Sequence, residues 1–122
     1  AYCNQQPVAE RLGAADWRAI LESLWPEVGQ GTYVYLTGGE PLLLREKLWG
    51  ARGLVRAAVH AGAACNINTN ALQLGPRAAL GLVSSGLGRI HVSLDSDQPL
   101  VQDPIRGGAG RWAQALRGLQ NL

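Results

Sequence analysis

The sequence contains no methionine and no phenylalanine, and it has only two cysteines among its 122 residues. A complete chain normally begins with methionine, whereas this one opens abruptly at Ala1-Tyr2-Cys3, so we expect it to be a piece of a longer protein. Two cysteines are too few for the disulfide framework of a small secreted domain. Their number suits a reducing compartment, and we expect a cytoplasmic location.

Charge and long apolar runs are also scarce. Lysine and arginine together number 11 and the acidic residues number 9, without any basic run, so no patch is set to neutralise nucleic-acid phosphates. No uninterrupted apolar stretch is long enough to span a membrane, and no charged segment precedes an apolar one as in a signal peptide. We therefore expect neither nucleic acid nor a membrane among the partners.

The residues that are present predict a folded chain of alternating helices and strands. Hydrophobic residues make up 47% of the chain, which excludes a disordered protein, and the length allows one domain or part of one. The predicted helices cover Trp17–Leu24 with Asp16 as N-cap and Pro26 beyond, Arg52–Ala61 followed by Gly62, the segment between Pro76 and Gly86, and Trp112–Leu119. The predicted strands cover Tyr33–Thr37, Ala64–Asn68 and Arg89–Leu94, with irregular segments over Leu42–Trp49 and Asp95–Gly110.

The spacing of these strands predicts a parallel sheet. They lie roughly 30 residues apart, the size of a unit in which a helix connects two parallel strands. Each strand has an apolar and a polar face, as where Ile90 and Val92 alternate with His91 and Ser93. A doubly wound, Rossmann-like sheet carries helices on both faces, and its central strands are apolar throughout. The polar face therefore favours an open barrel that holds a polar ligand.

Polar residues follow each predicted strand, where ligands bind in parallel α/β folds. These segments are Thr37-Gly38-Gly39-Glu40-Pro41, Asn68-Thr69-Asn70 and Ser93-Leu94-Asp95-Ser96. Two adjacent glycines let a ligand approach the backbone closely, and Glu40 offers a carboxylate to a ligand ammonium group. The alternative interpretation is a strand-to-loop turn with a solvated glutamate.

Taken together, these segments resemble the motifs of radical S-adenosylmethionine (SAM) enzymes. Gly38-Gly39-Glu40-Pro41 resembles the family's Gly-Gly-Glu-Pro motif, and Tyr2-Cys3-Asn4 resembles the end of its C-x-x-x-C-x-x-C motif. Asn68-Thr69-Asn70 resembles a strand-end motif, although Ala71 stands where glycine is usual. Arg89–Ser96 resembles the family's fourth strand, and Gln102–Gly107 resembles a later His-Asp-x-x-Arg-Gly segment, with Gln102 in the His place. The motifs occur in the family's order along almost the whole chain. They resemble most the branch with peptide-modifying and sulfatase-maturing enzymes and the first enzyme of molybdopterin synthesis.

The resemblance implies a fold, two cofactors and a reaction. The fold is α/β in class, a partial (β/α)6 barrel with parallel strands inside and helices outside. Three cysteines hold a [4Fe–4S] cluster, and SAM binds its open iron. An electron from a separate donor cleaves SAM to methionine and a 5′-deoxyadenosyl radical, which abstracts hydrogen from a substrate. The residues do not identify that substrate, which is a peptide, a protein or a small molecule.

The resemblance also implies roles for single residues. Cys3 would be the third cluster ligand and so the metal-binding residue. Glu40 would contact the methionine ammonium group, and Ser93 would reach the ribose or the methionine carboxylate. Arg106 would pair with that carboxylate, which guanidinium geometry favours, or is simply an exposed loop arginine. We expect Asp95 to hold the loop after its strand and Cys65 to lie in the core. His91 faces the barrel interior in this reading, as a packed histidine. The full set implied to bind SAM is Tyr2, Gly38, Gly39, Glu40, Asn70, Ser93 and Arg106.

The chain departs from the family because only one of the three cluster cysteines is present. We expect residues 1–122 to be a fragment of a single radical SAM core domain that lacks the N-terminal strand and the C-terminal half of the barrel. Such a fragment would be inactive alone, and its unpaired strand edges would favour aggregation. One alternative is a barrel without a cluster that acts as a binding or scaffold protein. A Rossmann-like nucleotide-binding domain is another, but it requires a Gly-x-Gly-x-x-Gly segment, which Gly38-Gly39 does not provide.

Overall fold

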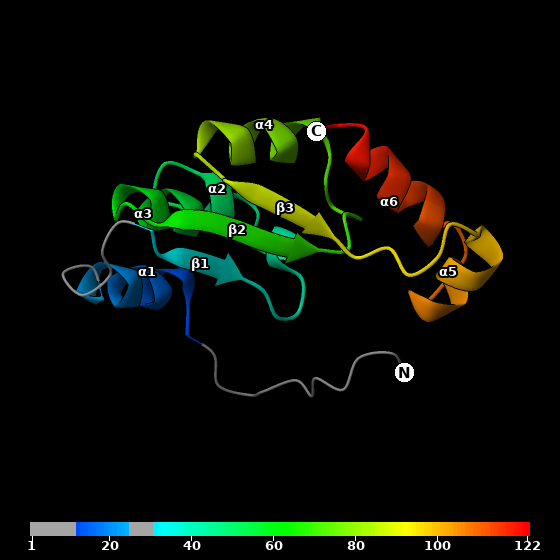
Figure 1. The fold of residues 1–122 in the computed structure, drawn as a ribbon, viewed down its shortest axis with the longest axis horizontal. Helices are drawn as coiled ribbons and strands as arrows, with labels where there is room; N and C mark the ends of the chain where they lie inside the picture. Colours follow the sequence, from blue (N-terminus) through cyan, green and yellow to red (C-terminus); the bar gives the residue numbers. More distant parts are fainter. Residues whose placement is uncertain (1–11, 25–30) are drawn as a thin grey trace.

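A computed structural model describes residues 12–24 and 31–122 of the chain. Three strands form one parallel sheet in the order β1-β2-β3, and Figure 1 shows them side by side and pointing the same way. The strands are β1 Tyr33–Leu36, β2 Ala64–Thr69 and β3 Arg89–Val92. The prediction of an α/β fold with parallel strands is confirmed, and the arrangement is consistent with part of a radical SAM-type barrel.

Helices precede, connect and follow these strands. Figure 1 shows α5 and α6 beyond the carboxyl ends of the strands, where the predicted ligand-binding segments lie. The helices of the described residues are α1 Ala14–Ser23, the short 3-10 helix η1 Pro41–Leu44, α2 Glu46–Trp49, α3 Leu54–His60, α4 Pro76–Ser84, α5 Pro99–Ile105 and α6 Arg111–Leu119. Gly62 and Gly86 adopt positive φ values of 76° and 87° just past α3 and α4, as expected of residues that end helices.

Three sequence predictions about the helices are wrong. Asp16 is not the N-cap of α1, because the helix begins earlier, with Gly13 as its N-cap; the Asp16 carboxylate instead accepts a hydrogen bond from the Gly13 amide at 2.7 Å. The predicted loop Leu42–Trp49 contains η1 and α2. The predicted irregular segment Asp95–Gly110 contains α5, with Pro99 in its first turn and Pro104 inside it. Interior proline disfavours a helix in sequence reasoning, which explains this last error.

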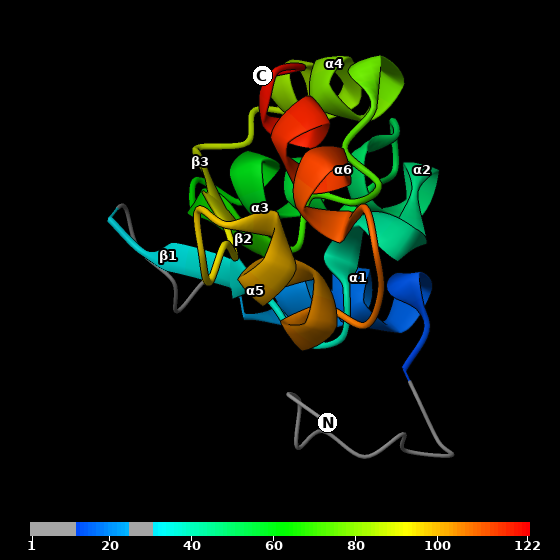
Figure 2. The same cartoon turned by 90° about the vertical axis from the view of Figure 1, so that its right-hand side faces the viewer.

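The hydrophobic core lies between one face of the sheet and the helices. Cys65 and Ile67 of β2 are fully buried and pair in register with Val34 and Leu36 of β1. Figure 2 shows α2, α3 and α4 on one side of the sheet, and Leu48, Val55 and Leu82 from these helices join the same core. No described helix packs across the opposite, polar face. This arrangement disagrees with a doubly wound sheet, which is covered on both faces.

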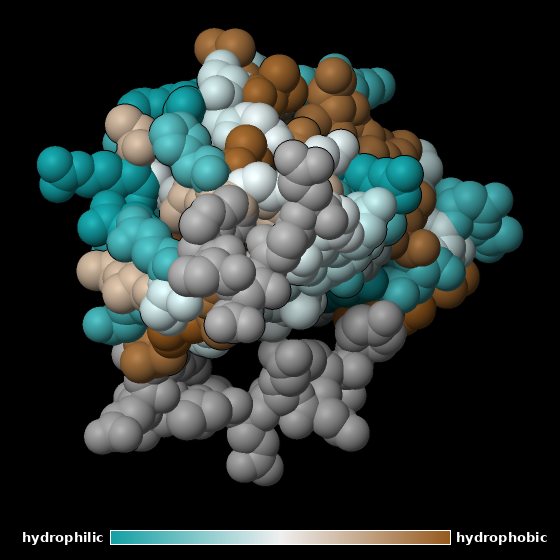
Figure 3. Space-filling model, turned by 60° about the vertical axis from the view of Figure 1, so that its left-hand side comes forward, coloured by the Kyte–Doolittle hydropathy of each residue, from teal (hydrophilic) through white to brown (hydrophobic). Residues whose placement is uncertain are grey.

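Some apolar surface stays exposed on the helical side. Leu80 and Val83 of α4 are 70% and 68% exposed. Figure 3 shows apolar surface along the upper part of the molecule, where α4 lies in Figure 1. Within the described residues, no helix is long and apolar enough to cross a membrane.

Candidate cofactor-binding site

The predicted glycine turn follows β1 directly and leaves its backbone open. Gly38 and Gly39 have φ values of +85° and +50°, which lie in the left-handed region that favours glycine. Both residues are exposed, and a Cβ added to either would meet no atom within 4 Å. A ligand can therefore approach the backbone of this turn as closely as the glycines allow.

Glu40 ties the glycine turn to the end of β2. Its Oε1 accepts hydrogen bonds from the Thr69 hydroxyl at 2.6 Å and from the Leu42 amide at 3.1 Å. Its Oε2 accepts one from the Asn70 amide at 2.8 Å. The contact with Leu42 caps η1, since Glu40 is the N-cap residue of that helix. The alternative of a solvated glutamate is wrong: this carboxylate is half-buried and fixes two strand ends together.

The segment after β2 is a tight turn that places Asn70 beside Glu40. The Asn70 side-chain oxygen accepts a hydrogen bond from the Leu72 amide at 2.9 Å, which is an Asx turn. Ala71 within this turn has φ +60°, in the left-handed region. This backbone conformation explains why the resembled motif has glycine there, because a Cβ in that region costs about 1–2 kcal/mol.

Ser93 lies next to Asn70 at the neighbouring strand end. Its amide donates to the Thr69 carbonyl oxygen at 2.8 Å and so extends the pairing of β2 with β3 by one residue. The same alternation that puts Ile90 and Val92 on the core side puts Ser93 on the polar face of the sheet. The carboxyl-terminal edge of the sheet, where the three strands end, therefore brings together Gly38, Gly39, Glu40, Asn70 and Ser93.

The polar face below this edge carries hydrogen-bonding side chains. The Tyr35 hydroxyl of β1 and His91 Nε2 of β3 lie 2.5 Å apart and are hydrogen bonded across β2. Both residues are exposed, and their ring centroids are 5.4 Å apart. His91 faces the polar side as predicted, but it is exposed and paired rather than packed in the core.

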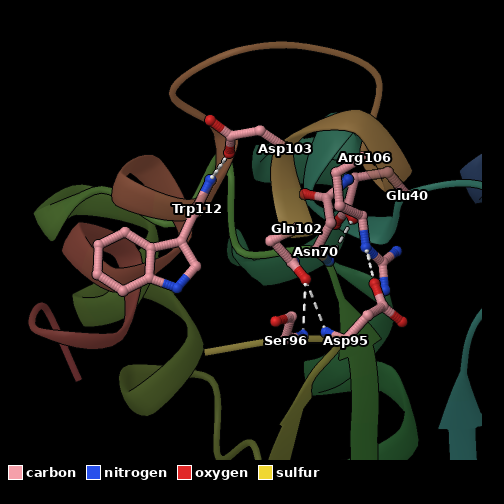
Figure 4. Close-up of polar contacts among 8 residues, drawn as sticks. All are labelled: Glu40, Asn70, Asp95, Ser96, Gln102, Asp103, Arg106 and Trp112. Carbon is pink, nitrogen blue, oxygen red and sulfur yellow. Dashed lines mark hydrogen bonds and ion pairs between the residues drawn. The ribbon is translucent and has the colours of Figure 1, made fainter. Parts of the chain in front are cut away.

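Asp95, Gln102 and Arg106 form a second group just past β3, drawn in Figure 4. Arg106 Nε donates to Asp95 Oδ2 at 2.6 Å, and the two side chains are only 15% and 22% exposed. The side-chain oxygen of the buried Gln102 accepts from the amides of Asp95 and Ser96 at 2.8 and 3.1 Å. Asp95 thus holds the loop after its strand, as predicted. Contact of Arg106 with a ligand carboxylate stays a prediction.

The structure tests the prediction for only one of the two cysteines. Cys65 is fully buried on the core side of β2, as predicted, and burial raises the pKa of its thiol from 9.0 to about 11. Cys3 and Tyr2 lie outside the described residues, so their predicted roles remain predictions. Among residues 12–24 and 31–122, no group of three or more His, Cys, Asp or Glu residues could hold a metal ion.

Two residues that hold the segments after β2 and β3, Thr69 and Gln102, are given no role by the sequence predictions. The motif gives Thr69 no contact of its own, yet its hydroxyl donates to Glu40 and accepts from the Ala71 amide at 3.0 Å. Gln102 stands in the His place of the resembled motif, and it is 1% exposed and holds the loop after β3 through its side-chain oxygen. No sequence signal marks Gln102, because it is the only buried residue of α5 and its apolar neighbours Leu100 and Val101 are exposed.

Comparison with known proteins identifies the family to which this chain belongs. Residues 2–122 match the model of the radical SAM superfamily. The chain is 27% identical over 122 residues to an AdoMet-dependent heme synthase of Oleidesulfovibrio alaskensis, covering all of this chain and 30% of the relative. It is 35% identical over 116 residues to a GTP 3′,8-cyclase of Picosynechococcus, covering 92% of this chain and 33% of the relative.

A third relative carries another name. The chain is 34% identical over 111 residues to a mycofactocin maturase of Mycobacterium tuberculosis, covering 91% of this chain and 27% of the relative. The chain therefore spans about a third of the length of the curated relatives that it matches. The family match covers nearly all of the sequence, and the described glycine turn, strand ends and parallel sheet agree with it. The chain belongs to the radical SAM superfamily, whose members are enzymes that use S-adenosylmethionine and a [4Fe–4S] cluster.

Proposed function

We propose that this chain is part of the core domain of a radical SAM enzyme and supplies most of its SAM-binding edge. When bound, the cluster supplies one electron that cleaves SAM to a 5′-deoxyadenosyl radical, which abstracts hydrogen from a substrate. The observation that carries the proposal is the open glycine turn, which Glu40 fixes to the end of β2. The one-electron donor, the substrate and a cytoplasmic location belong to the proposal as well.

The described residues fit SAM but supply no complete cluster site. Open backbone at Gly38 and Gly39 is a cradle that side chains would fill at any other residue type. The donors and acceptors beside it are an Asx turn, a carboxylate and a hydroxyl-bearing strand end, which suit the ammonium, carboxylate and ribose groups of SAM. Cys3 would give one thiolate to the cluster, and further thiolates must come from elsewhere in the whole protein.

The chain's own part in the reaction is to bind and orient. Glu40 would accept a hydrogen bond from the methionine ammonium group through lone pairs that its three protein donors leave free, since a carboxylate has about four acceptor sites. Ser93 would reach the ribose or the carboxylate from the neighbouring strand, with Asn70 and Tyr2 lining the pocket. The Asp95–Arg106 pair fixes the guanidinium group at this edge, where it would attract the carboxylate.

The names of the relatives support a shared cofactor site rather than a shared substrate. They are a heme synthase, a GTP cyclase and a mycofactocin maturase, and this chain matches each over about a third of its length. We infer that the matched third carries the common SAM chemistry. The substrate would then be selected mainly by parts of the whole protein outside residues 1–122.

Anaerobic iron and sulfide analysis of the whole parent protein, combined with an assay for 5′-deoxyadenosine, tests this proposal. We expect about four iron atoms and four sulfides per chain and reductant-dependent cleavage of SAM. A parent that binds no iron would overturn the proposal and favour the cluster-free barrel that acts as a binding or scaffold protein.

A matched pair of cysteine variants sharpens this test. Cys3→Ser in the parent should lose the cluster, because a hydroxyl replaces a thiolate ligand. Cys65→Ala should keep its iron, because Cys65 is buried in the core and faces away from the site. Equal iron content in both variants would contradict the assignment of Cys3.

A further inference from the structure

A cavity with three arginines lies on the helical side of the molecule, outside the SAM-binding edge. It has a volume of about 450 Å³ and lies between α1 and α3, which contact each other. Its charged or titratable lining residues are Arg18, Glu22, Arg52, Arg56 and His60. With histidine neutral, three guanidinium groups face one carboxylate, which leaves two net positive charges around the cavity.

Two of these guanidinium groups hold buried nitrogen atoms without a hydrogen-bond partner. In the described part of the chain, only three side-chain atoms are buried and unpartnered, namely Arg18 Nε, Arg56 Nε and Trp112 Nε1. Two of the three therefore belong to this one cavity. Because guanidinium donors are stabilised by acceptors, the clustering of these groups favours an acceptor in or beside the cavity.

The contacts that these arginines do make leave room for such an acceptor. Arg18 Nε lies 3.4 Å from Glu22 Oε1, which is an ion pair but not a hydrogen bond of good geometry. Arg56 uses one terminal nitrogen to donate to the Ser84 carbonyl oxygen at 2.9 Å, which anchors the side chain. Arg52 is exposed at the rim of the cavity.

We propose that this cavity binds the phosphate group of a small phosphorylated molecule. A phosphate monoester carries close to two negative charges at neutral pH, which matches the two net positive charges of the lining. Guanidinium groups bind phosphate oxygens through parallel N–H donors, and Arg18, Arg52 and Arg56 bring three such groups to the lining of the cavity. The volume exceeds that of a phosphate group and lies within the usual range for small-molecule sites, so the cavity has space for the rest of the ligand.

The test titrates the whole parent protein, labelled with ¹⁵N-arginine, with inorganic phosphate and with glycerol 3-phosphate, at an ionic strength held constant with chloride. The Nε–Hε signals of Arg18 and Arg56 should shift and saturate with either ligand. Tighter binding of glycerol 3-phosphate supports a phosphorylated molecule, whereas equal affinity overturns that part of the proposal in favour of free phosphate. Shifts that do not saturate, or that chloride alone reproduces, overturn the site itself.

Charge-neutral variants locate the binding. Arg56→Gln and Arg52→Gln should each weaken binding roughly tenfold, because each removes a charge-assisted donor. Arg52 is exposed, so Arg52→Gln keeps the test valid if the loss of the Arg56–Ser84 hydrogen bond unfolds the other variant. Arg117→Gln removes an exposed positive charge from α6 and should leave the affinity unchanged. Equal weakening in all three variants would show non-specific attraction and overturn the site.

Discussion

Glu40 joins parts of the molecule that are far apart in the sequence. Its carboxylate accepts three hydrogen bonds, from the Leu42 amide, the Thr69 hydroxyl and the Asn70 amide. The resemblance gave this residue a role toward the cofactor alone. The structure adds a structural role, because the same two oxygens set the distance between the glycine turn and the end of β2.

Glu40→Gln should therefore destabilise the fold as well as affect the cofactor. A glutamine amide turns its NH₂ group toward at least one of these donors, so a half-buried hydrogen bond is lost and donors face each other. We expect the free energy of unfolding to fall by about 1–3 kcal/mol in urea denaturation. Glu46→Gln is the control, because Glu46 is exposed and pairs with the exposed Arg77. It should change the free energy of unfolding by no more than about 0.5 kcal/mol. Similar losses in both variants would contradict the structural role of Glu40.

Cys65 gives stability a defined dependence on alkaline pH. Its pKa is about 11 in the folded chain and 9.0 ordinarily, so the unfolded chain releases this proton first as pH rises. Stability is therefore unaffected by this group below pH 9 and falls between pH 9 and 11, by roughly 1–3 kcal/mol. Denaturation of the wild type and of Cys65→Ala across this range would show the loss as a difference in slope. Parallel pH profiles would contradict the buried neutral thiol.

At the scale of the element, α6 depends on a residue outside it. Its N-cap residue is Gly110, which has no side chain, and Asp103 of α5 takes over the capping role. The two Asp103 carboxylate oxygens accept from the Gly110 and Trp112 amides, each at 2.6 Å. Figure 4 shows the Asp103 carboxylate directed at the Trp112 backbone. This contact fixes α5 and α6 relative to each other.

Asp103→Ala should loosen α6 and the segment that carries Arg106. Removal of a side-chain cap costs about 1–2 kcal/mol, and we expect that loss in thermal or urea denaturation. Faster hydrogen exchange at the Gly110 and Trp112 amides should accompany it. Asp97→Ala is the control, because Asp97 is exposed in the loop that precedes α5 and is not the N-cap residue of that helix. A stability of Asp103→Ala equal to that of Asp97→Ala would show that the cap contributes nothing.

The elements also show which parts of the fold the sequence can predict. The three strands and helices α3, α4 and α6 were predicted because apolar periodicity, Pro76 and the glycines Gly62 and Gly86 all agree locally. Helix α5 is not predicted because Pro104 lies inside it and its stabilising contacts, with Asp95 and with α6, are tertiary contacts that no periodicity of the segment itself reveals. The motifs predict the glycine turn and the position of Asn70 at the end of β2, but the Asn70 Asx turn is seen only in the structure, and the Glu40–Thr69 hydrogen bond is tertiary and leaves no local signal.

At the scale of the whole molecule, the sheet has two edges in the described part of the chain. β1 and β3 each pair only with β2, so both present unpaired backbone groups. Parallel strands with open edges pair readily with other chains.

We therefore expect residues 1–122 to self-associate as an isolated chain, in a concentration-dependent way. Tyr33→Lys puts a charge on the exposed side of β1, where Tyr33 is 66% exposed, and should reduce the associated fraction several-fold in analytical ultracentrifugation. Leu100→Lys is the control, because Leu100 is 90% exposed on α5, away from the strand edges. A purely monomeric wild-type chain, or an equal effect of Leu100→Lys, would contradict association through β1.

The Asn70 amide proton points at Glu40 Oε2, one of the two oxygens next to the glycine turn. Any ligand that draws Glu40 toward itself lengthens this hydrogen bond, and any ligand that holds Glu40 in place shortens the time the bond spends open. A single backbone proton at the end of β2 thus reports, through its exchange with solvent deuterium, whether the neighbouring edge is occupied. Occupancy could be followed in this way without a radical, an assay product or an identified substrate.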